Sequence, residues 1–118
     1  MQSFVATSIA ATAAEAGKEV AAKIAAGIEG AKVAMTYGSC DYDSAELLAA
    51  IAAELPGVPV LGNTSFTGIV TPEGFVGGDD PFVGILALVE QGDELRTDDG
   101  TSGIALGGFK GLLVADAE

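Results

Sequence analysis

A short polar loop gathers four side chains that are able to do chemistry. An apolar stretch over residues 31–37 stops at Gly38, and Asp43 then starts a helix. The loop between them contains Ser39, Cys40, Asp41 and Tyr42. In open α/β sheets, ligands bind at loops that leave the carboxyl ends of strands. The pattern therefore predicts a place where a small ligand binds, with little catalytic equipment.

Cys40 is the only cysteine, and the chain has no histidine. A helix N-terminus stabilises a thiolate, so Cys40 is a candidate reactive thiol. Two other interpretations are a thiol that lines a ligand site and a small thiol without a role. Without histidine, the commonest general base and the commonest metal ligand are missing. We expect no metal, no cofactor and no catalysis, and an enzyme that uses Cys40 or Asp41 is the remaining catalytic alternative.

The charges in the loop suggest a ligand with one negative and one positive group. Backbone N–H groups at the start of the following helix favour an anionic group such as a carboxylate. A ligand ammonium group would pair with Asp41, and this split polarity suits an amino acid. In the alternative interpretation, Asp43 simply caps the helix and Asp41 is solvated.

A second polar segment follows the third expected strand and consists of Gly62, Asn63, Thr64 and Ser65. It lies beside the first loop if the second and third strands are neighbours. Gly62 permits close backbone approach, and the other three offer neutral hydrogen-bonding groups. The two segments together predict one rim of a ligand pocket, and an ordinary turn held by its own side chains is the alternative.

The first half of the chain predicts a β-α-β-α-β order. Strands are expected at residues 3–8, 32–37 and 58–61, and helices at 11–28 and 44–55. Thr12 with Glu15, and Asp43 with Glu46, mark the two helix starts, and Gly30 marks the end of the first helix. The second helix should bury Leu47, Leu48, Ile51 and Leu55. Strands joined by crossover helices should run parallel, with right-handed crossings.

The second half shows no helical period and predicts antiparallel strands. A hairpin is expected from residues 68–70 and 74–76, followed by a long strand over 82–90 and a turn at 92–95. Residues 103–115 are rich in glycine and end in a strand-like run, Leu112–Ala115. The fold class is therefore α/β, a mixed sheet with two main helices.

Length and charge set the broad class of the protein. The 118 residues predict one domain, and a net charge of −12 disfavours binding to nucleic acid or to an anionic membrane surface. No uncharged apolar run is long enough to span a bilayer, and the N-terminus lacks the basic start of a signal peptide. We expect a cytoplasmic protein. Two helices hardly cover both faces of such a sheet, so we also expect a homo-oligomer, most simply a dimer.

The order of these segments resembles a known family. A strand that ends in a Tyr-Asp loop precedes a Glu-Leu-Leu helix, and the run Leu-Pro-Gly-Val-Pro-Val-Leu-Gly-Asn-Thr-Ser follows at residues 55–65. A glycine-bearing hairpin and a Val-Gly-Ile-Leu-Ala-Leu strand come next. This pattern resembles the N-terminal domain of FIST proteins over residues 4–90, most specifically over 41–64. Members of that family usually continue into a companion domain, and often into a signalling output module.

The resemblance implies a cytoplasmic, non-catalytic domain that binds small ligands such as amino acids in signal transduction. The leading hypothesis is therefore a small-molecule binding or sensing domain. The alternative is a structural or assembly protein that self-associates through its sheet, in which the two polar loops are merely turns.

Overall fold

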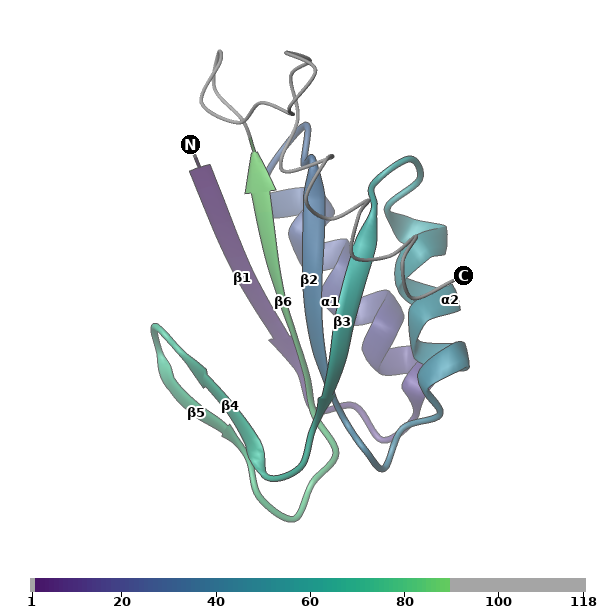
Figure 1. Cartoon of the computed structure of the whole chain (residues 1–118), viewed down its shortest axis with the longest axis vertical. Helices are drawn as coiled ribbons and strands as arrows, with labels where there is room; N and C mark the ends of the chain where they lie inside the picture. The colour runs from purple at the N-terminus through teal and green to yellow at the C-terminus, as the bar shows by residue number, and fades with distance from the viewer. Residues whose placement is uncertain (1, 90–118) are drawn as a thin grey trace, which may run out of the picture.

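Two helices pack against one face of a four-stranded sheet, and a small hairpin stands at one end of that sheet (Figure 1). The structure, a computed structural model, describes residues 2–89. The elements in chain order are β1 (Gln2–Ser8), α1 (Ala13–Gly27), β2 (Val33–Ser39), α2 (Ser44–Glu54), β3 (Val60–Ser65), β4 (Gly68–Thr71), β5 (Gly74–Gly77) and β6 (Val83–Val89). The α/β class, the β-α-β-α-β start and the mixed sheet with two main helices are confirmed.

The strand order in the main sheet is β1-β6-β2-β3. Strand β6 runs antiparallel to both of its neighbours, whereas β2 and β3 are parallel. The second and third strands are therefore neighbours, which is the condition under which the two polar segments were expected to lie side by side. Strands β1 and β2 run in the same direction, but β6 lies between them, so the last described strand fills the centre of the sheet.

Helix α1 begins where the capping residues predict. The Thr12 hydroxyl accepts a hydrogen bond from the Glu15 amide at 3.2 Å, and this N-cap satisfies one of the free donors of the first turn. The helix ends at Gly27, earlier than the expected stop at Gly30. Its buried stripe recurs every three to four residues and consists of Ala13, Ala16, Gly17, Val20, Ala21 and Ile24.

Helix α2 packs closely along α1 because small residues meet at the crossing. A Cβ at Gly17 would lie 2.7 Å from the Cβ of Ala50 and 2.8 Å from the Leu47 carbonyl oxygen. The Asp43 side chain caps α2 by accepting from the Glu46 amide at 2.9 Å. Leu48, which was expected on the buried face, is 42% exposed. The expectation was wrong because this helix faces α1 and the sheet through a narrow stripe, and Leu48 lies to one side of it.

The third strand differs in extent from its predicted range. The third strand was expected at residues 58–61, but β3 spans Val60–Ser65 and includes the segment that was interpreted as a loop. The reason is the parallel pairing with β2, which continues as far as the pair Ser39 and Ser65. The hairpin is confirmed as β4 and β5. The turn expected at 92–95 and the strand-like run at 112–115 lie outside the described residues.

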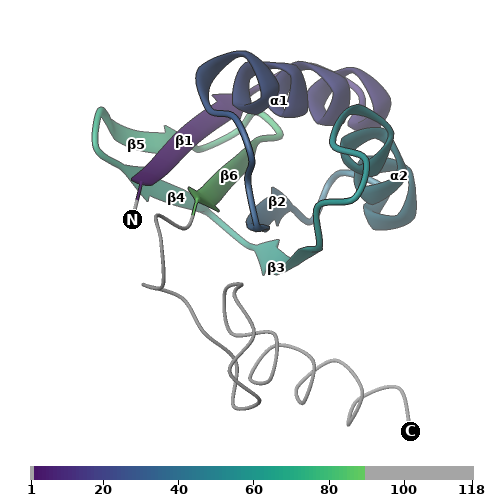
Figure 2. The same ribbon diagram turned by 90° about the horizontal axis from the view of Figure 1, so that it is seen from above.

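Only one face of the main sheet is covered by the helices, as the view from above shows (Figure 2). Since side chains alternate along a strand, the register places five half-buried apolar residues together on the other face, which we call the open face: Val5, Met35, Leu61, Leu86 and Leu88. The hairpin reaches this face at one end, because a Cβ at Gly84 would meet the side chain of Ile69. Neither described helix has the length and apolarity that a membrane crossing requires.

Candidate functional site

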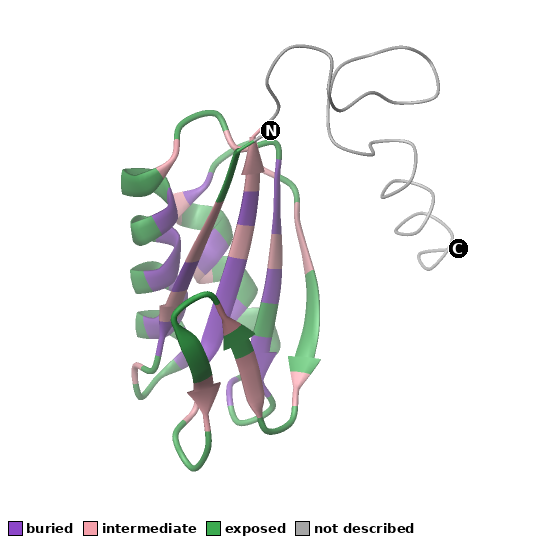
Figure 3. Cartoon of the chain, turned by 90° about the vertical axis from the view of Figure 1, so that its left-hand side faces the viewer, coloured by how far each residue is buried: buried purple, intermediate pink, exposed green. Residues whose placement is uncertain are grey.

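A cavity of about 190 Å³ lies between α2, the carboxyl-terminal half of β2 and strand β3. The parallel register sets Thr36 beside Gly62 and Gly38 beside Thr64, so that the two strands form its floor. Residues of α2 form its wall. The lining consists of Thr36, Gly38, Ser39, Ser44, Leu47, Leu48, Val60, Leu61, Gly62, Asn63 and Thr64. The cavity lies at the sheet edge, where the middle of β3 is exposed (Figure 3).

Two glycines keep the floor of this cavity flat. A Cβ at Gly38 would lie 2.8 Å from Cδ2 of Leu47. A Cβ at Gly62 would meet the backbone of Thr36 across the strand pair. Side chains at these positions would therefore push β3 and α2 away from β2 or fill the space between them. Their absence leaves room for a small molecule against the sheet.

Thr36 is the unusual residue of the lining. Strand alternation puts its side chain on the helix-covered face with that of Ala34, which is part of the core. Thr36 is only 3% exposed, and its Oγ1 has no hydrogen-bond partner among the described residues. A buried polar group without a partner costs about 1–3 kcal/mol. Such a group in a cavity wall is a natural anchor for a ligand.

The part of the lining that the structure describes carries hydroxyl, amide and apolar groups but no charged side chain. The nearest carboxylates are engaged in the loop outside it. The Ser39 hydroxyl accepts from the Asp41 amide at 3.1 Å and donates to the Asp41 carboxylate at 3.3 Å, and Asp43 caps α2. The cavity itself therefore offers neutral hydrogen bonds and apolar contact.

The structure brings together half of the residues that the sequence singled out. Ser39, Gly62, Asn63 and Thr64 line the cavity. The other four, which are not part of the lining, are Cys40, Asp41, Tyr42 and Ser65. Cys40 is exposed in the turn after β2, and the Ser65 hydroxyl donates to the Gly68 carbonyl at 2.5 Å. The two segments meet at one rim as expected, but the rim is strand rather than loop.

Tyr42 has a structural role, because its side chain joins two loops. It is buried, and its hydroxyl donates to the Ala10 carbonyl at 2.5 Å. This bond ties the loop before α2 to the loop before α1. Burial, with a smaller contribution from the Glu19 carboxylate, raises the pKa of the Tyr42 phenol above 10.0. The side chain therefore holds two loops together and is not available to a ligand in the cavity.

Sequence reasoning missed Thr36, Gly38, Ser44, Leu47, Leu48, Val60 and Leu61 as cavity residues. Two signals pointed to them. Thr36 and Gly38 are spaced by two residues within an apolar strand, which puts a hydroxyl and a missing side chain on the same face. Leu48 sits beside Leu47, so both cannot face the same narrow core stripe.

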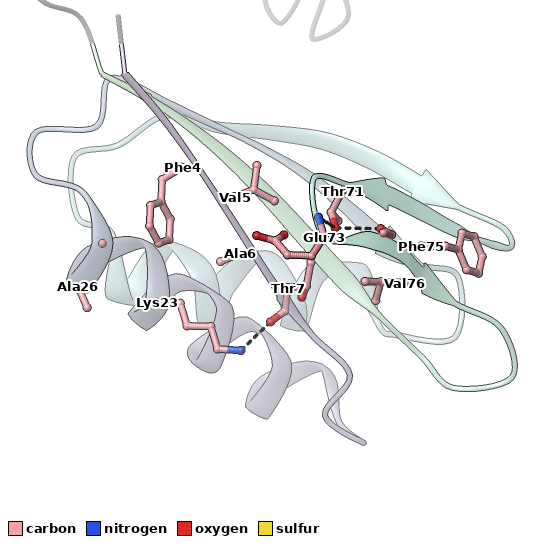
Figure 4. A pocket seen from close by; sticks show the side chains of 12 residues that line it. Phe4, Val5, Ala6, Thr7, Lys23, Ala26, Thr71, Glu73, Phe75 and Val76 are labelled. Atoms are coloured by element: carbon pink, nitrogen blue, oxygen red, sulfur yellow. Dashed lines mark hydrogen bonds between the residues drawn. The ribbon is translucent and has the colours of Figure 1, made fainter.

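A wider trough of about 530 Å³ lies between β1, α1 and the hairpin (Figure 4). Several of its polar groups already have partners. The Lys23 ammonium donates to the Thr7 carbonyl at 2.9 Å and pairs with Glu19 at 3.1 Å, as the spacing of Lys23 and Glu19 predicts. Thr71 bonds to Gly74 across the hairpin turn. The trough is larger than the cavity at α2, but among residues 2–89 no buried side-chain polar atom of its lining lacks a hydrogen-bond partner.

Comparison with known proteins gives no family for the chain: no protein-family model matches it, and no curated protein matches it either. The resemblance to FIST domains therefore stays a prediction.

Proposed function

We propose that the protein is a small-molecule binding domain and that the cavity between α2, β2 and β3 is its ligand site. The observation that carries the proposal is the Thr36 hydroxyl, which is buried in the cavity wall without a partner among residues 2–89. Three elements supply the lining, so occupancy of the cavity would stiffen the contact of α2 with the sheet. That coupling suits a sensor, in agreement with the intracellular signalling role that the FIST resemblance implies.

A fragment screen followed by amide chemical-shift mapping tests this proposal. We expect some small ligand to shift the amides of Gly38, Gly62 and Thr64 in a saturable way, while the amides of the trough stay unchanged. Thr64→Leu should block binding, because the larger side chain enters the cavity mouth. Thr67→Leu is the matched control, since this exposed threonine lies beyond β3 and outside the lining. A screen without any cavity ligand would reject the proposal.

The alternative is a protein that assembles through its sheet, and the apolar open face favours it. Phe66, Val70 and Phe75 add exposed apolar surface on the hairpin side, with exposed fractions of 85%, 85% and 63%. Apolar patches of this kind mark interaction sites. A stable dimer in light scattering, together with no cavity ligand in the screen, would favour assembly over ligand binding.

A further inference from the structure

We propose that the ligand of this cavity is an uncharged, short aliphatic molecule with one hydrogen-bonding end, such as a primary amide or an alcohol. This inference rests on the proposed function and names the chemical class that the site would take. It departs from the amino acid that the loop charges suggested, because those charges do not line the cavity.

The size of the cavity limits the ligand to a few heavy atoms. Liquid water occupies about 30 Å³ per molecule, so 190 Å³ corresponds to roughly six waters. An apolar cavity of about 150 Å³ accommodates benzene. A molecule of about six to eight non-hydrogen atoms therefore fills the cavity, and a larger metabolite would project from its mouth.

The electrostatics of the site exclude a charged ligand. Among residues 2–89, no charged side chain lines the cavity to pair with a carboxylate or an ammonium group, and an unpaired charge is costly to bury. The positive end of the α2 dipole would attract an anion, but the Asp43 carboxylate already occupies the first turn. The net charge of −12 opposes anions further.

The arrangement of polar and apolar groups gives the ligand an orientation. The Thr36 hydroxyl, in the floor on β2, both donates and accepts hydrogen bonds, and Thr64 supplies a second hydroxyl from β3. Leu47, Leu48 and Val60 offer apolar contact for an aliphatic body. The Thr36 oxygen has almost no accessible surface, so a molecule that bonds to it must enter the cavity and displace the atoms packed over the hydroxyl. A primary amide matches this hydroxyl pair with a donor and an acceptor of its own.

Four probes of matched shape test the charge selectivity on the full chain. Isobutyramide is uncharged, isobutyrate is an anion, isobutylammonium is a cation and valine is a zwitterion. Each is titrated at millimolar concentration while the amide shifts of Gly38, Gly62 and Thr64 are recorded. We expect saturable binding of isobutyramide, and binding of the three charged probes that is weaker by at least about tenfold, because each must bury an unpaired charge.

The outcomes separate this inference from the function on which it rests. Binding of valine, isobutyrate or isobutylammonium in the cavity as tightly as isobutyramide would overturn the uncharged class and leave the ligand site standing. Shifts by none of the four probes would also overturn the class. The ligand site itself fails only if the broader fragment screen finds no cavity ligand. Thr36→Val should weaken isobutyramide about threefold to tenfold, the value of one hydrogen bond, while Thr7→Val leaves its affinity unchanged.

Discussion

At the scale of single residues, the proposed ligand site depends on one hydroxyl in the middle of an apolar strand. Thr36 stands where the packing alone would favour valine, which has nearly the same shape. The hydroxyl forms no hydrogen bond among residues 2–89, and a buried polar group without a partner lowers the stability of the fold. A buried polar group without a partner is expected beside a cavity where a ligand supplies the missing hydrogen bond.

Replacement of that residue gives a first prediction. Thr36→Val should raise the free energy of unfolding by about 1 kcal/mol, because it removes a buried polar group that has no partner. Urea denaturation of the ligand-free protein measures the change. Thr7→Val, at a half-buried position on β1, should change the value by less than about 0.5 kcal/mol. A loss of stability in Thr36→Val would show that the hydroxyl is already satisfied.

Tyr42 gives a prediction on the alkaline side. Its raised pKa means that the folded state holds the phenol proton more tightly than the unfolded state. The resulting stability is fully present below pH 10 and is lost as the pH rises through the folded pKa. Tyr42→Phe should cost about 1 kcal/mol at neutral pH, because the bond to Ala10 is lost, and should flatten part of the alkaline decline.

Urea denaturation of the original protein and of Tyr42→Phe, below and above pH 10, checks this expectation, with Tyr37→Phe as the control. Tyr37 is 39% exposed. If Tyr42→Phe and Tyr37→Phe changed the alkaline profile equally, the proposed role of the buried phenol would be wrong.

At the scale of elements, the contact between β2, β3 and α2 determines the site. The two floor glycines serve different neighbours, and this gives a third prediction. Gly62→Ala should destabilise the protein by about 2–3 kcal/mol, because the new methyl group meets the fixed backbone of Thr36. Gly38→Ala should cost less, since it meets only the end of the flexible Leu47 side chain. If urea denaturation showed the same loss of unfolding free energy for Gly62→Ala and Gly38→Ala, the expected difference between a rigid backbone neighbour and a flexible side-chain neighbour would be wrong.

The elements were largely predictable because their signals are local. Thr12 and Asp43 cap their helices through side-chain bonds three residues on, and such spacing is visible in a sequence. The extent of β3 was not, because Gly62 and Asn63 have low strand propensity and are held extended by pairing with β2. Half of the eight site residues predicted from the two polar segments line the cavity. Thr36 and Leu48 were not predicted, because their roles depend on how closely α2 approaches the sheet.

At the scale of the whole molecule, both helices of the described part of the chain lie on the same face of the sheet (Figure 2). Strand order could not be read from the sequence, because the insertion of β6 between β1 and β2 is a pairing of distant segments. The consequence is the apolar open face opposite the helices. The Lys23 ammonium on the Thr7 carbonyl occupies one backbone acceptor of β1, and an engaged lysine of this kind discourages pairing at a sheet edge.

The open face yields a fourth prediction, on self-association. We expect a dimer in light scattering, and we expect added salt to strengthen it, because salt screens the repulsion between two chains of charge −12. Leu61→Lys should weaken the dimer by placing a charge on this face. Ala25→Lys, on the exposed side of α1, should have no such effect. A monomer at every salt concentration would reject assembly through the sheet.

A crystal structure of the protein soaked with isobutyramide tests the central claim most directly. The account predicts density for one molecule between α2 and the β2–β3 pair, with an amide atom about 3 Å from the Thr36 Oγ1. Density only in the trough beside Phe4, or an amide turned away from Thr36, would contradict it.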